Sequence, residues 1–505
     1  YNKELCCELE DDTPKKINQW SKIYYADFET DTTTNPHDPY LCCICHKNEC
    51  GKLIGNKFTG ENISSQLLNY LQHNSLTYFH NLKYDACFFI NDEEWNSAVT
   101  QRSGTVLQII MTKKMTYMKE GKEITWTKRL TFRNSYSLIP APLRAFASMF
   151  NLKVHKEIMA YKIYTKANRQ RGSVTIKEFY DQYCEENKDV KNEEDLAKDY
   201  EQIIRNAELA KALKGSELDL MKYAYFYCMK DCVVLLDGMD KFNNDLNEVF
   251  KETKKEFLGI HQFISISAVG YDFARIYGCF NGCCKLSGKP QNFIQRCVNG
   301  GRTMTANNQK QYVEGRIQDF DAVSLYPSAM SVMNGVPKGI PKVIPDNVSE
   351  NDLMKYDTFF AEVNITELKP KSEMPYKFGQ VFKLSDTGSK LFVNETVSNF
   401  YLDKITLLDL IEFYDIKYDI IRGYYFDEGF NKHINQFITK LFNLRLKYKK
   451  MNNPLEKTIK LLLNSIYGKS ILKPMVDEVT LVNRDKLTSY IYRNYNFIKE
   501  VTIEN

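Results

Sequence analysis

The stretch 319–328 constrains this chain more than any other part, and it reads Asp-Phe-Asp-Ala-Val-Ser-Leu-Tyr-Pro-Ser. Apolar residues recur over 311–317, so we expect a strand there that ends at the acidic pair. Pro327 suits the first turn of a helix expected over 328–334. A carboxylate between a strand end and a helix start can hold a hard divalent cation. An ordinary junction with a solvated acidic rim explains the Asp-x-Asp spacing, taken alone, more simply.

The bulk properties describe a large globular protein. A chain of 505 residues is too long for one hydrophobic core, so we expect two or three domains. Hydrophobic residues make up 43% and charged residues 26%, and no apolar run is long enough to span a membrane. No secretory signal opens the chain, and its first residue is Tyr1 rather than Met, so we expect it to be part of a longer protein. The net charge of only +4 means that clustering of positive charge matters more than its sum.

A second acidic motif lies near the start, in the β-rich run 22–30. The period of two in a strand puts Asp27 and Glu29 on one face, with Phe28 buried on the other. Two carboxylates that point into one space repel each other unless cations lie between them. The alternative for this pair alone is an exposed acidic strand end.

Two further motifs follow in order. A strand over 76–79 leads into His-Asn-Leu-Lys-Tyr-Asp at residues 80–85, which begins a helix. A helix expected over 217–239 carries Tyr227 and Asp231, which are four residues apart and therefore share a face.

A cysteine-rich run lies between the first two motifs: Cys42, Cys43, Cys45, His46 and Cys50. A zinc site is one interpretation, but no second ligand pair follows at finger spacing. The alternation over 40–45, the turn over 48–52 and the return over 53–58 favour a plain β-hairpin. We expect the cysteines of the chain to be reduced thiols.

Asp-x-Glu, Asn-x-x-Tyr-Asp and Tyr-x-x-x-Asp, in this order, resemble the three motifs of DnaQ-like 3′–5′ exonucleases, which have an RNase H-like fold. The resemblance implies that two divalent ions are held by four carboxylates: Asp27, Glu29, Asp85 and Asp231. Such ions activate the attacking water and stabilise the leaving oxygen. Tyr227 would orient that water.

The stretch 319–328 resembles the palm signature Asp-x-x-Ser-Leu-Tyr-Pro of family B DNA polymerases. By this resemblance Asp321 binds the catalytic metal and the Ala322 carbonyl is a second ligand to the same ion. Tyr326 would be the steric gate under the sugar of the incoming nucleotide. Asp319 matches no ligand of the family, so we treat it as structural. The cofactor expected at each of the two active sites is a pair of Mg²⁺ or Mn²⁺ ions.

The string 78–85 is especially similar to the protein-primed branch of that family. Residues at matching positions there contact single-stranded DNA, which implies this role for Thr30, Tyr78, His80, Asn81, Tyr84 and Phe88. Aromatic rings can stack frayed bases at roughly 1–3 kcal/mol each. Core packing is the alternative for Tyr78 and Phe88. Lys156 lies where the branch places a lysine near the scissile phosphate, on a loose local match.

The stretch 430–470 predicts a helical hairpin that is broken by Asn-Asn-Pro at 452–454. Its second helix contains Lys-x-x-x-Asn-Ser-x-Tyr-Gly, which resembles the fingers motif of the family. By this resemblance, Lys460 meets the triphosphate, Asn464 lies beside it and Tyr467 packs at the nascent base pair. Further contacts expected from this hairpin are Lys449 and, more weakly, Arg445 to phosphate, and Lys469 to DNA. The alternative is an amphipathic hairpin with a solvated basic face.

The pair Gly300-Gly301 resembles the Tyr-x-Gly-Gly element at the exonuclease–polymerase junction, where backbone amides contact template. Val298 stands in place of the tyrosine, which removes the aromatic contact. Two glycines permit close approach of the backbone to phosphate, but they can equally make only a tight turn.

The expected fold class is a multidomain chain of α/β and α+β type, with an RNase H-like (DnaQ-like) exonuclease domain followed by palm and helical-hairpin fingers. The expected order is a peripheral segment 1–20, an exonuclease domain 21–245 with a charged helical insertion near 165–215, a linker and start of palm 246–310, a palm strand and helix 311–335, palm with a terminal-protein-region insertion 336–425, fingers 426–472, and a further insertion or palm segment 473–505. The insertion over 336–425 is inferred from length, with strands expected over 358–365, 390–393 and 423–426 and a helix over 404–414. The later metal-binding motif of the family, Tyr-x-Asp-Thr-Asp-Ser, does not occur in the sequence.

These motifs identify the chain as similar to a template-directed, protein-primed DNA polymerase with a proofreading exonuclease, acting in replication of a viral or plasmid genome. Expected partners are primer-template DNA, single-stranded DNA, dNTPs and a terminal protein primer, with no membrane. The expected location is the cytoplasm of a host cell, with a virus factory or an organelle as alternatives. Two other interpretations stay open: a fragment with exonuclease activity alone, and a catalytically inactive module that binds DNA ends.

Overall fold

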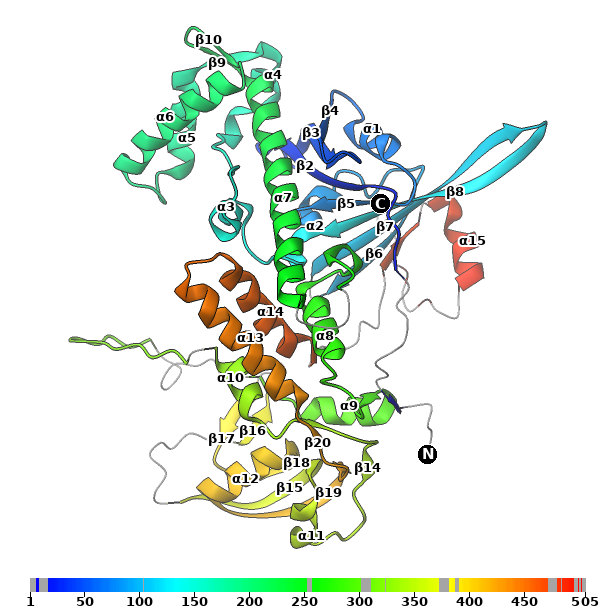
Figure 1. Ribbon diagram of the computed structural model, residues 1–505, viewed down its shortest axis with the longest axis vertical. Coiled ribbons are helices and arrows are strands. Elements are labelled where there is room, and N and C mark those ends of the chain that lie inside the picture. The colour runs from blue at the N-terminus through cyan, green and yellow to red at the C-terminus, as the bar shows by residue number, and fades with distance from the viewer. Residues whose placement is uncertain are drawn as a thin grey trace. The chain divides into compact units, whose positions relative to one another are not determined.

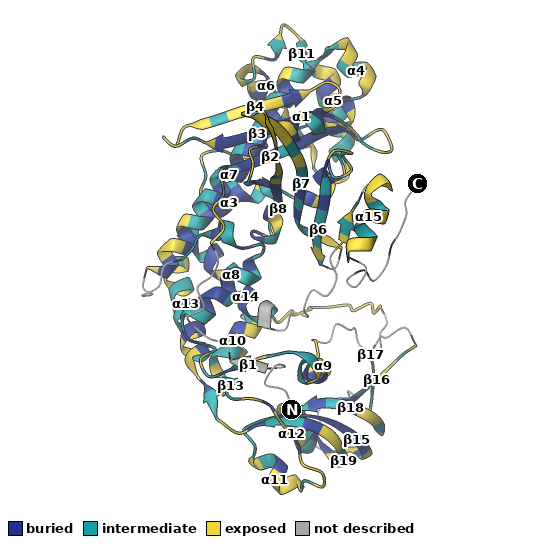
Figure 2. Cartoon of the chain, turned by 90° about the vertical axis from the view of Figure 1, so that its right-hand side faces the viewer, coloured by how far each residue is buried: buried dark blue, intermediate teal, exposed yellow. Residues whose placement is uncertain are grey.

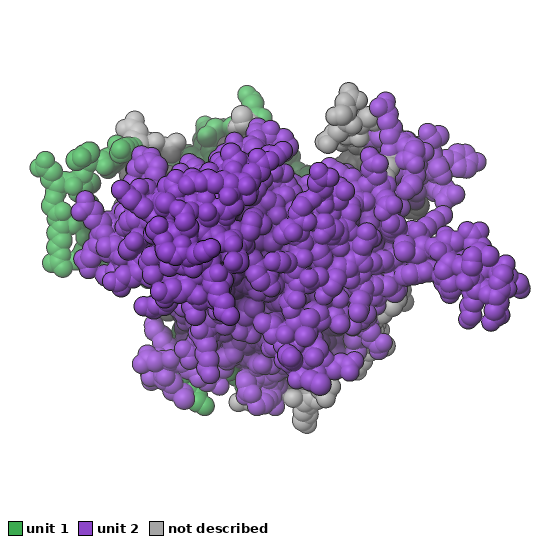
Figure 3. Space-filling model, turned by 90° about the horizontal axis from the view of Figure 1, so that it is seen from above, with its two compact units in different colours: residues 1–15, 270–447, 462–473 green, residues 16–269, 448–461, 474–505 purple. Residues whose placement is uncertain are grey.

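The computed structural model describes residues 6–8, 17–102, 104–251, 257–300, 310–322, 324–371, 381–386, 390–470, 479–482, 484–494, 498 and 501. The chain divides into two compact units (Figure 3). Unit 2 comprises 16–269, 448–461 and 474–505, and unit 1 comprises 1–15, 270–447 and 462–473. Among the described residues, none of the helices combines the length and the apolar character that crossing a membrane requires.

Unit 2 is built on an eight-stranded sheet with the order β21-β6-β7-β8-β5-β2-β3-β4 (Figure 1). Strand β2 pairs in parallel with β5, which pairs in parallel with β8, whereas β3 is antiparallel to β2 and β4. This order of five strands, β4-β3-β2-β5-β8, is the RNase H-like arrangement that the motifs predicted. The strands are β2 Ile23–Asp31, β3 Asp38–Lys47, β4 Leu53–Thr59, β5 Ser75–Phe79, β6 Asn96–Arg102, β7 Thr105–Lys119, β8 Lys122–Asn134 and β21 Val479–Leu481.

The long helix α7 (Leu220–Phe250) packs on β2 and β3 of this sheet. Its start is set by Asp219, whose side chain accepts the Lys222 N–H at 3.0 Å and satisfies a free donor of the first turn. Burial of the central strands β2 and β3 is visible in Figure 2. The other helices near the sheet are α1 Ile63–Tyr70, α2 Leu82–Ala86 and α3 Phe146–Phe150. Rings of Phe79, Phe89 and Phe132 meet in the core at centroid distances of 4.6–6.3 Å.

The predicted charged insertion is helical. Its elements are α4 Lys166–Arg171, β9 Ser173–Thr175, α5 Ile176–Asn187, α6 Glu193–Leu209, β10 Leu213–Lys214 and β11 Glu217–Asp219. Helix α5 begins with a capping box, in which the Thr175 hydroxyl and the Glu178 carboxylate each accept the other residue's backbone N–H. The small sheet β10-β11-β9 was not predicted, because strands of two or three residues leave no alternation to detect.

The cysteine-rich run forms the predicted hairpin of β3 and β4. Cys42, Cys43 and Cys45 are buried and Cys50 is exposed, and all four are free thiols. Within the described ranges, the cysteines of this hairpin join no group of potential metal ligands.

The structure revises two of the expected boundaries of the exonuclease domain. Unit 2 extends to residue 269 instead of 245, and α7 within it continues past 245 to Phe250 as one helix. Strand β21 pairs antiparallel with β6, so 474–505, with helix α15 (Arg484–Asn494), belongs to unit 2 rather than to a further palm segment. Three residues of β21 carried too short a pattern to predict this pairing.

Unit 1 contains a four-stranded sheet with the order β14-β19-β15-β18. Its strands are β14 Lys342–Val343, β15 Thr358–Pro370, β18 Val397–Asp403 and β19 Tyr414–Phe426, and β16 Val381–Leu384 pairs separately with β17 Lys390–Val393. Helix α12 (Lys404–Phe413) buries Leu407 and Leu410 in the core of this unit. The strands and the helix expected over 336–425 are therefore present.

The remaining helices of unit 1 include α8 Ile266–Ile276, whose first residues belong to unit 2, α9 Gly288–Cys297, α10 Leu325–Val332 and α11 Glu350–Lys355. Near the chain start, β1 (Cys6–Glu8) pairs with β12 (Cys284–Leu286) in unit 1. The predicted helical hairpin forms as α13 (His433–Lys450) and α14 (Leu455–Ser470), of which residues 448–461 belong to unit 2. Asn452 has a φ of 49° in the turn, which a helical residue does not adopt.

The strand expected over 311–317 was wrong. Residues 310–322 form neither helix nor strand, and Tyr312 is 97% and Phe320 86% exposed. A strand is stable only when its backbone groups pair with a neighbour, and within the described residues this segment has no such pairing. The helix that follows, α10, does form, and it contains Pro327 in its first turn as expected.

Candidate active sites

Four acidic side chains from three elements of unit 2 converge. Asp27 and Glu29 come from one face of β2, Asp85 from α2 and Asp231 from α7. The Phe28 N–H donates to Asp85 Oδ1 at 3.3 Å, which ties α2 to the central strand. Each of the other three carboxylates raises the pKa of Asp27, so all four lie within electrostatic reach of one another.

The electrostatics of this carboxylate cluster require a positive partner. Burial is the main cause that raises the pKa values of Asp27, Glu29 and Asp85, and repulsion among the acidic groups adds to it. Burial also raises the pKa of Asp231 to about 6, against the opposing attraction of Lys156. Bringing such groups together as anions is costly unless cations neutralise them.

The donor set fits divalent cations. It consists of carboxylate oxygens, which are the ligands that hard ions such as Mg²⁺ and Mn²⁺ prefer. In addition, Asp231 Oδ1 is buried without a hydrogen-bond partner among the described residues, which is a costly state for a carboxylate oxygen that binds nothing. The predicted residues could therefore hold metal at this place.

Three side chains complete the cluster. The Lys156 ammonium forms an ion pair with Asp231 and lies 4.8 Å from the centroid of the Tyr227 ring. The ion pair outweighs burial and raises the pKa of Lys156, so this group stays charged. The hydroxyl groups of Tyr227 and Tyr161 are 2.7 Å apart. Sequence reasoning missed Tyr161, which follows no motif and reaches the cluster from the one-turn helix Tyr161–Ile163.

Sequence reasoning also missed Cys228, whose Sγ lies within 4.8 Å of ligand oxygens of Asp27 and Glu29. Its spacing carried a usable signal, because residues three apart on a helix share a face and Cys228 precedes Asp231 by three. A thiol among carboxylates changes which cations the site can bind.

The side chains predicted to contact single-stranded DNA divide into two groups. In the first, Thr30 Oγ1 lies 2.6 Å from the Tyr84 hydroxyl, which is 2.8 Å from His37 Nδ1. Tyr84 is 36% exposed, and its ring contacts the half-buried Phe88 ring at a centroid distance of 5.4 Å. Asn81 is exposed at the start of α2. These side chains line up beside Asp85 and are accessible in part, with Thr30 itself buried.

Tyr78 and His80 form the second group and are held inside unit 2. Tyr78 is completely buried and stacks on Tyr25. Its ring therefore has no face available to a base. Core packing, the alternative considered above, accounts for this residue. His80 lies 3.0 Å both from the Ser135 hydroxyl and from the Ala141 carbonyl oxygen. Burial lowers the pKa of His80 to about 4, so the ring is neutral near pH 7 and positions the loop before α2.

In unit 1 the clearest contact between predicted site residues is a ring stack. The rings of Tyr326 on α10 and Tyr467 on α14 lie 4.2 Å apart with an interplanar angle of 12°. Arg445 donates to Ser324 Oγ at 2.8 Å, next to the start of α10. The structure therefore brings the predicted gate tyrosine to the predicted fingers motif.

The other predicted residues of the polymerase motifs are exposed. Asp321 and Ala322 lie in the segment 310–322, which has no regular structure. Lys460 and Asn464 are exposed and four residues apart on α14, and Lys449 is exposed on α13. Gly300 is exposed, with open space where a side chain would be. Gly301 and the Lys469 side chain lie outside the described residues.

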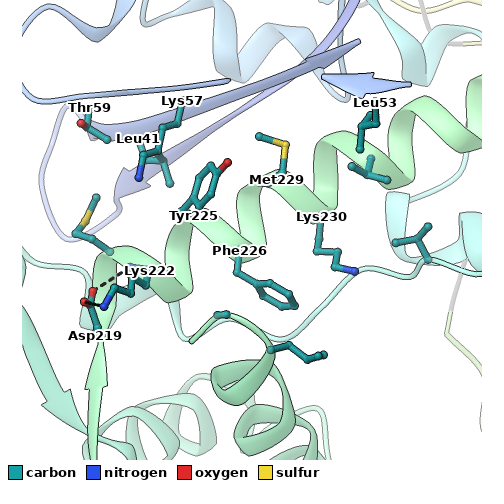
Figure 4. Close-up of a pocket in the computed structure, with 15 residues that line it drawn as sticks. Leu41, Leu53, Lys57, Thr59, Asp219, Lys222, Tyr225, Phe226, Met229 and Lys230 are labelled. Carbon is teal, nitrogen blue, oxygen red and sulfur yellow. Dashed lines mark hydrogen bonds and ion pairs between the residues drawn. The ribbon is translucent and has the colours of Figure 1, made fainter. Parts of the chain in front are cut away.

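A pocket of about 780 Å³ in unit 2 is separate from the carboxylate cluster (Figure 4). Its lining comes from β3, β4, the insertion and other positions of α7, including Tyr225, Phe226 and Met229. None of the predicted site residues lines it. The candidate site formed by the four carboxylates is therefore not part of this pocket.

Comparison with known proteins agrees with this architecture. A family model described as DNA polymerase type B, organellar and viral, matches residues 67–505. The chain therefore belongs to this family of type B DNA polymerases. A "Probable DNA polymerase" of Agaricus bitorquis is 25% identical over 75% of this chain, and one of Neurospora intermedia is 22% identical over 81%. The chain spans only 44% and 40% of the lengths of these two curated relatives.

Solved structures of Phi29 DNA polymerase share the fold. The ternary complex with primer-template DNA and incoming nucleotide has a TM-score of 0.57 and 17% identity, and the match covers 88% of this chain and 67% of the other. The complex with single-stranded DNA has a TM-score of 0.55 at 17% identity, covering 90% and 68%. This likeness confirms the predicted fold class, an RNase H-like domain followed by elements of palm and fingers.

Proposed function

We propose that this chain serves template-directed DNA synthesis and removes nucleotides from 3′ ends by a proofreading exonuclease activity. The observation that carries the proposal is the convergence of the half-buried Asp27 and the buried Glu29, Asp85 and Asp231 from three elements into one cluster. Membership in the type B family supports the synthetic half.

The exonuclease half follows from what each side chain can do. The four carboxylates would hold two divalent ions, with Mg²⁺ or Mn²⁺ the expected cofactor. When bound, such ions activate a water molecule and stabilise the leaving oxygen of the phosphodiester. The Tyr227 hydroxyl, fixed by Tyr161, orients the attacking water. The Lys156 ammonium neutralises part of the charge on the scissile phosphate while it keeps Asp231 in place.

The single strand reaches this cluster along Tyr84, Phe88 and Asn81. These residues lie on or beside α2, next to Asp85. The half-exposed rings can stack an unpaired base, and stacking tolerates any base sequence. Thr30 fixes the Tyr84 hydroxyl and thereby the orientation of the ring.

The synthetic half rests on α10 and α14. Lys460 would bind the triphosphate, Asn464 would lie beside it, and the stacked pair Tyr326–Tyr467 would provide a flat surface for the sugar and the nascent base pair. Crowding under the sugar by Tyr326 would exclude a 2′-hydroxyl. Asp321 and the Ala322 carbonyl would contribute the metal ligands of this half.

The proposed substrates and partners are primer-template DNA, single-stranded DNA and dNTPs, with a hydroxyl of a terminal protein as the first primer. Phi29 DNA polymerase has been solved in complex with primer-template DNA and incoming nucleotide, and in complex with single-stranded DNA. Replication of a viral or plasmid genome inside a host cell is the proposed role.

One observation favours a narrower second candidate, exonuclease activity alone. The carboxylate cluster of unit 2 is assembled, whereas Asp321 is exposed in a segment without regular structure. An inactive module that binds DNA ends is disfavoured, because all four carboxylates and Tyr227 keep competent side chains.

The test measures both activities on crossed variants. With Mg²⁺ and a 5′-labelled single strand, Asp27→Ala with Glu29→Ala should reduce shortening by roughly 1000-fold or more while DNA binding is retained. Asp38→Ala is the matched control, since Asp38 is an exposed carboxylate at the start of β3. Unchanged shortening in the double variant would remove the exonuclease assignment.

The same comparison extends to synthesis. In the full-length protein, Asp321→Ala should abolish nucleotide incorporation on a primer-template and leave shortening intact. Incorporation that survives this change would refute the role of Asp321. Shortening without incorporation in the unmutated full-length protein would select the narrower candidate.

A further inference from the structure

The carboxylate cluster contains a sulfur ligand. Cys228 is completely buried on α7, between Tyr227 and the turn that carries Asp231. Its Sγ and the carboxylate oxygens of Asp27 and Glu29 all lie within 4.8 Å of one another, a spacing that one cation can bridge. The Sγ–H currently donates to the Asp27 carbonyl oxygen at 3.4 Å.

Sulfur and oxygen donors select different cations. Oxygen-only sites suit Mg²⁺ and Mn²⁺, whereas a thiolate adds strong affinity for Zn²⁺ and Cd²⁺. Asp231 Oδ1, which is buried and has no hydrogen-bond partner among the described residues, belongs to the same carboxylate cluster but not to this group of three ligand atoms. Two carboxylates and one thiolate make a three-ligand set of the kind that Zn²⁺ binds.

We propose that Cys228, with Asp27 and Glu29, forms a capture site for Zn²⁺ or Cd²⁺ within the exonuclease cluster. This inference rests on the proposed exonuclease function. Binding breaks the S–H bond, forms a sulfur–metal bond and releases one proton to water, and the hydrogen bond to the Asp27 carbonyl is lost. No electrons are transferred.

Capture of such an ion has a functional consequence. Asp27 and Glu29 are also the carboxylates that would hold Mg²⁺, so the two kinds of cation compete for them. An ion held by the thiolate and both carboxylates would take the place of the Mg²⁺ that these carboxylates are proposed to hold. Zn²⁺ or Cd²⁺ would therefore inhibit degradation of DNA by occupying the cluster.

The alternative is a purely structural thiol. Cys228 is surrounded by the buried thiols of Cys43 and Cys232, and Cys232 donates to the Cys43 carbonyl at 3.4 Å. A packed thiol of this kind would bind no cation in preference to the other buried cysteines. The two possibilities differ in one respect: a capture site needs Asp27 and Glu29 as ligands, whereas a structural thiol does not.

The test uses Cd²⁺ as the probe, because cadmium bound to thiolate has an ultraviolet charge-transfer absorption that requires no enzyme turnover. Cd²⁺ is titrated into the chain without Mg²⁺. We expect Cys228→Ser to remove one equivalent of the absorption and the matching release of one proton. Asp27→Asn with Glu29→Gln should weaken the same equivalent roughly tenfold or more, since it removes two of its ligands. Cys50→Ser, at an exposed cysteine outside the cluster, should leave it unchanged.

Two outcomes overturn the proposal. Absorption that is equal in the unmutated chain and in Cys228→Ser means that Cys228 binds no cadmium. Absorption lost in Cys228→Ser but unaffected by the carboxylate variant means that the thiol binds cadmium away from Asp27 and Glu29. Thermal unfolding of each variant confirms folding. Failure of the exonuclease proposal is recognised separately, as absence of Mg²⁺-dependent shortening in the unmutated chain.

Discussion

The two acidic regions of this chain differ in how far the described residues complete them. In unit 2, β2 contributes two carboxylates and α2 and α7 one each to a single cluster, and Lys156 and the tyrosine pair lie beside it. In unit 1, Asp321 lies in an exposed segment, and the ordered part of the region is the Tyr326–Tyr467 stack. The carboxylates of the first region could hold cations together, whereas the second region shows mainly stacked rings and exposed polar side chains.

The difference shows what makes an acidic motif a site. Asp27 and Glu29 belong to a central strand with paired neighbours on both sides, so their directions are determined by the sheet. The residues before Asp321 pair with no strand in the described part of the chain, so the backbone there has no such support. Variants that affect one region and spare the other test whether the two are independent.

The largest of the remaining effects is expected at Lys156. A substitution there should weaken the carboxylate cluster of unit 2 and leave the region around Tyr326 unchanged, which would sharpen the difference between the two regions. Lys156→Met leaves Asp231 without its ion pair and removes the positive charge beside the proposed scissile phosphate. Shortening of a labelled single strand should fall roughly 100-fold, and Lys156→Arg should restore part of it. Lys153→Met, at an exposed lysine three residues earlier in the chain, is the control. Equal rates for Lys156→Met and the unmutated chain would show that the lysine is only a structural cation.

An intermediate effect is expected in the other region. Tyr326→Val removes the ring that stacks on Tyr467 and opens space under the proposed sugar position. In the full-length protein, the preference for deoxynucleotides over ribonucleotides should fall about tenfold or more. A tenfold change corresponds to a loss of about 1.4 kcal/mol in the discrimination between the two sugars. Shortening of single strands should not change. A loss of shortening would contradict the independence of the two regions.

The smallest effect is a pH dependence of stability in the metal-free protein. A carboxylate with a raised pKa binds more protons in the folded protein than in the unfolded chain. Its contribution to folding stability is therefore present below about pH 4 and is lost as the pH rises through about 6, the pKa of Asp231 in the folded protein. In EDTA, the unfolding temperature of Asp231→Asn relative to the unmutated chain should therefore rise by on the order of a few degrees between pH 4 and 7. Mg²⁺ should reduce the difference. A constant difference across this range would mean that Asp231 is ionised without cost.

Much of the cluster could be predicted because its motifs report local geometry. The period of two in a strand places Asp27 and Glu29 together, and the helical period places Tyr227 with Asp231. The strand order of unit 2 then brings these elements side by side, as the resemblance to DnaQ-like exonucleases implied.

Other features depend on long-range contacts that no local pattern records. Tyr161 joins Tyr227 across 66 residues, and β21 reaches β6 from the far end of the chain. Tyr78 matched a DNA-contact motif but is buried against Tyr25, since a tyrosine in a central strand serves the core equally well. The strand expected before Asp321 failed for the opposite reason, because its apolar pattern finds no neighbour to pair with among the described residues.

The most direct measurement is anomalous X-ray scattering from crystals of this chain soaked in Mn²⁺. The account predicts manganese peaks enclosed by the carboxylate oxygens of Asp27, Glu29, Asp85 and Asp231, which vanish in crystals of the variant Asp27→Asn with Glu29→Gln. Peaks elsewhere only, or four carboxylates that point away from one another, would contradict it.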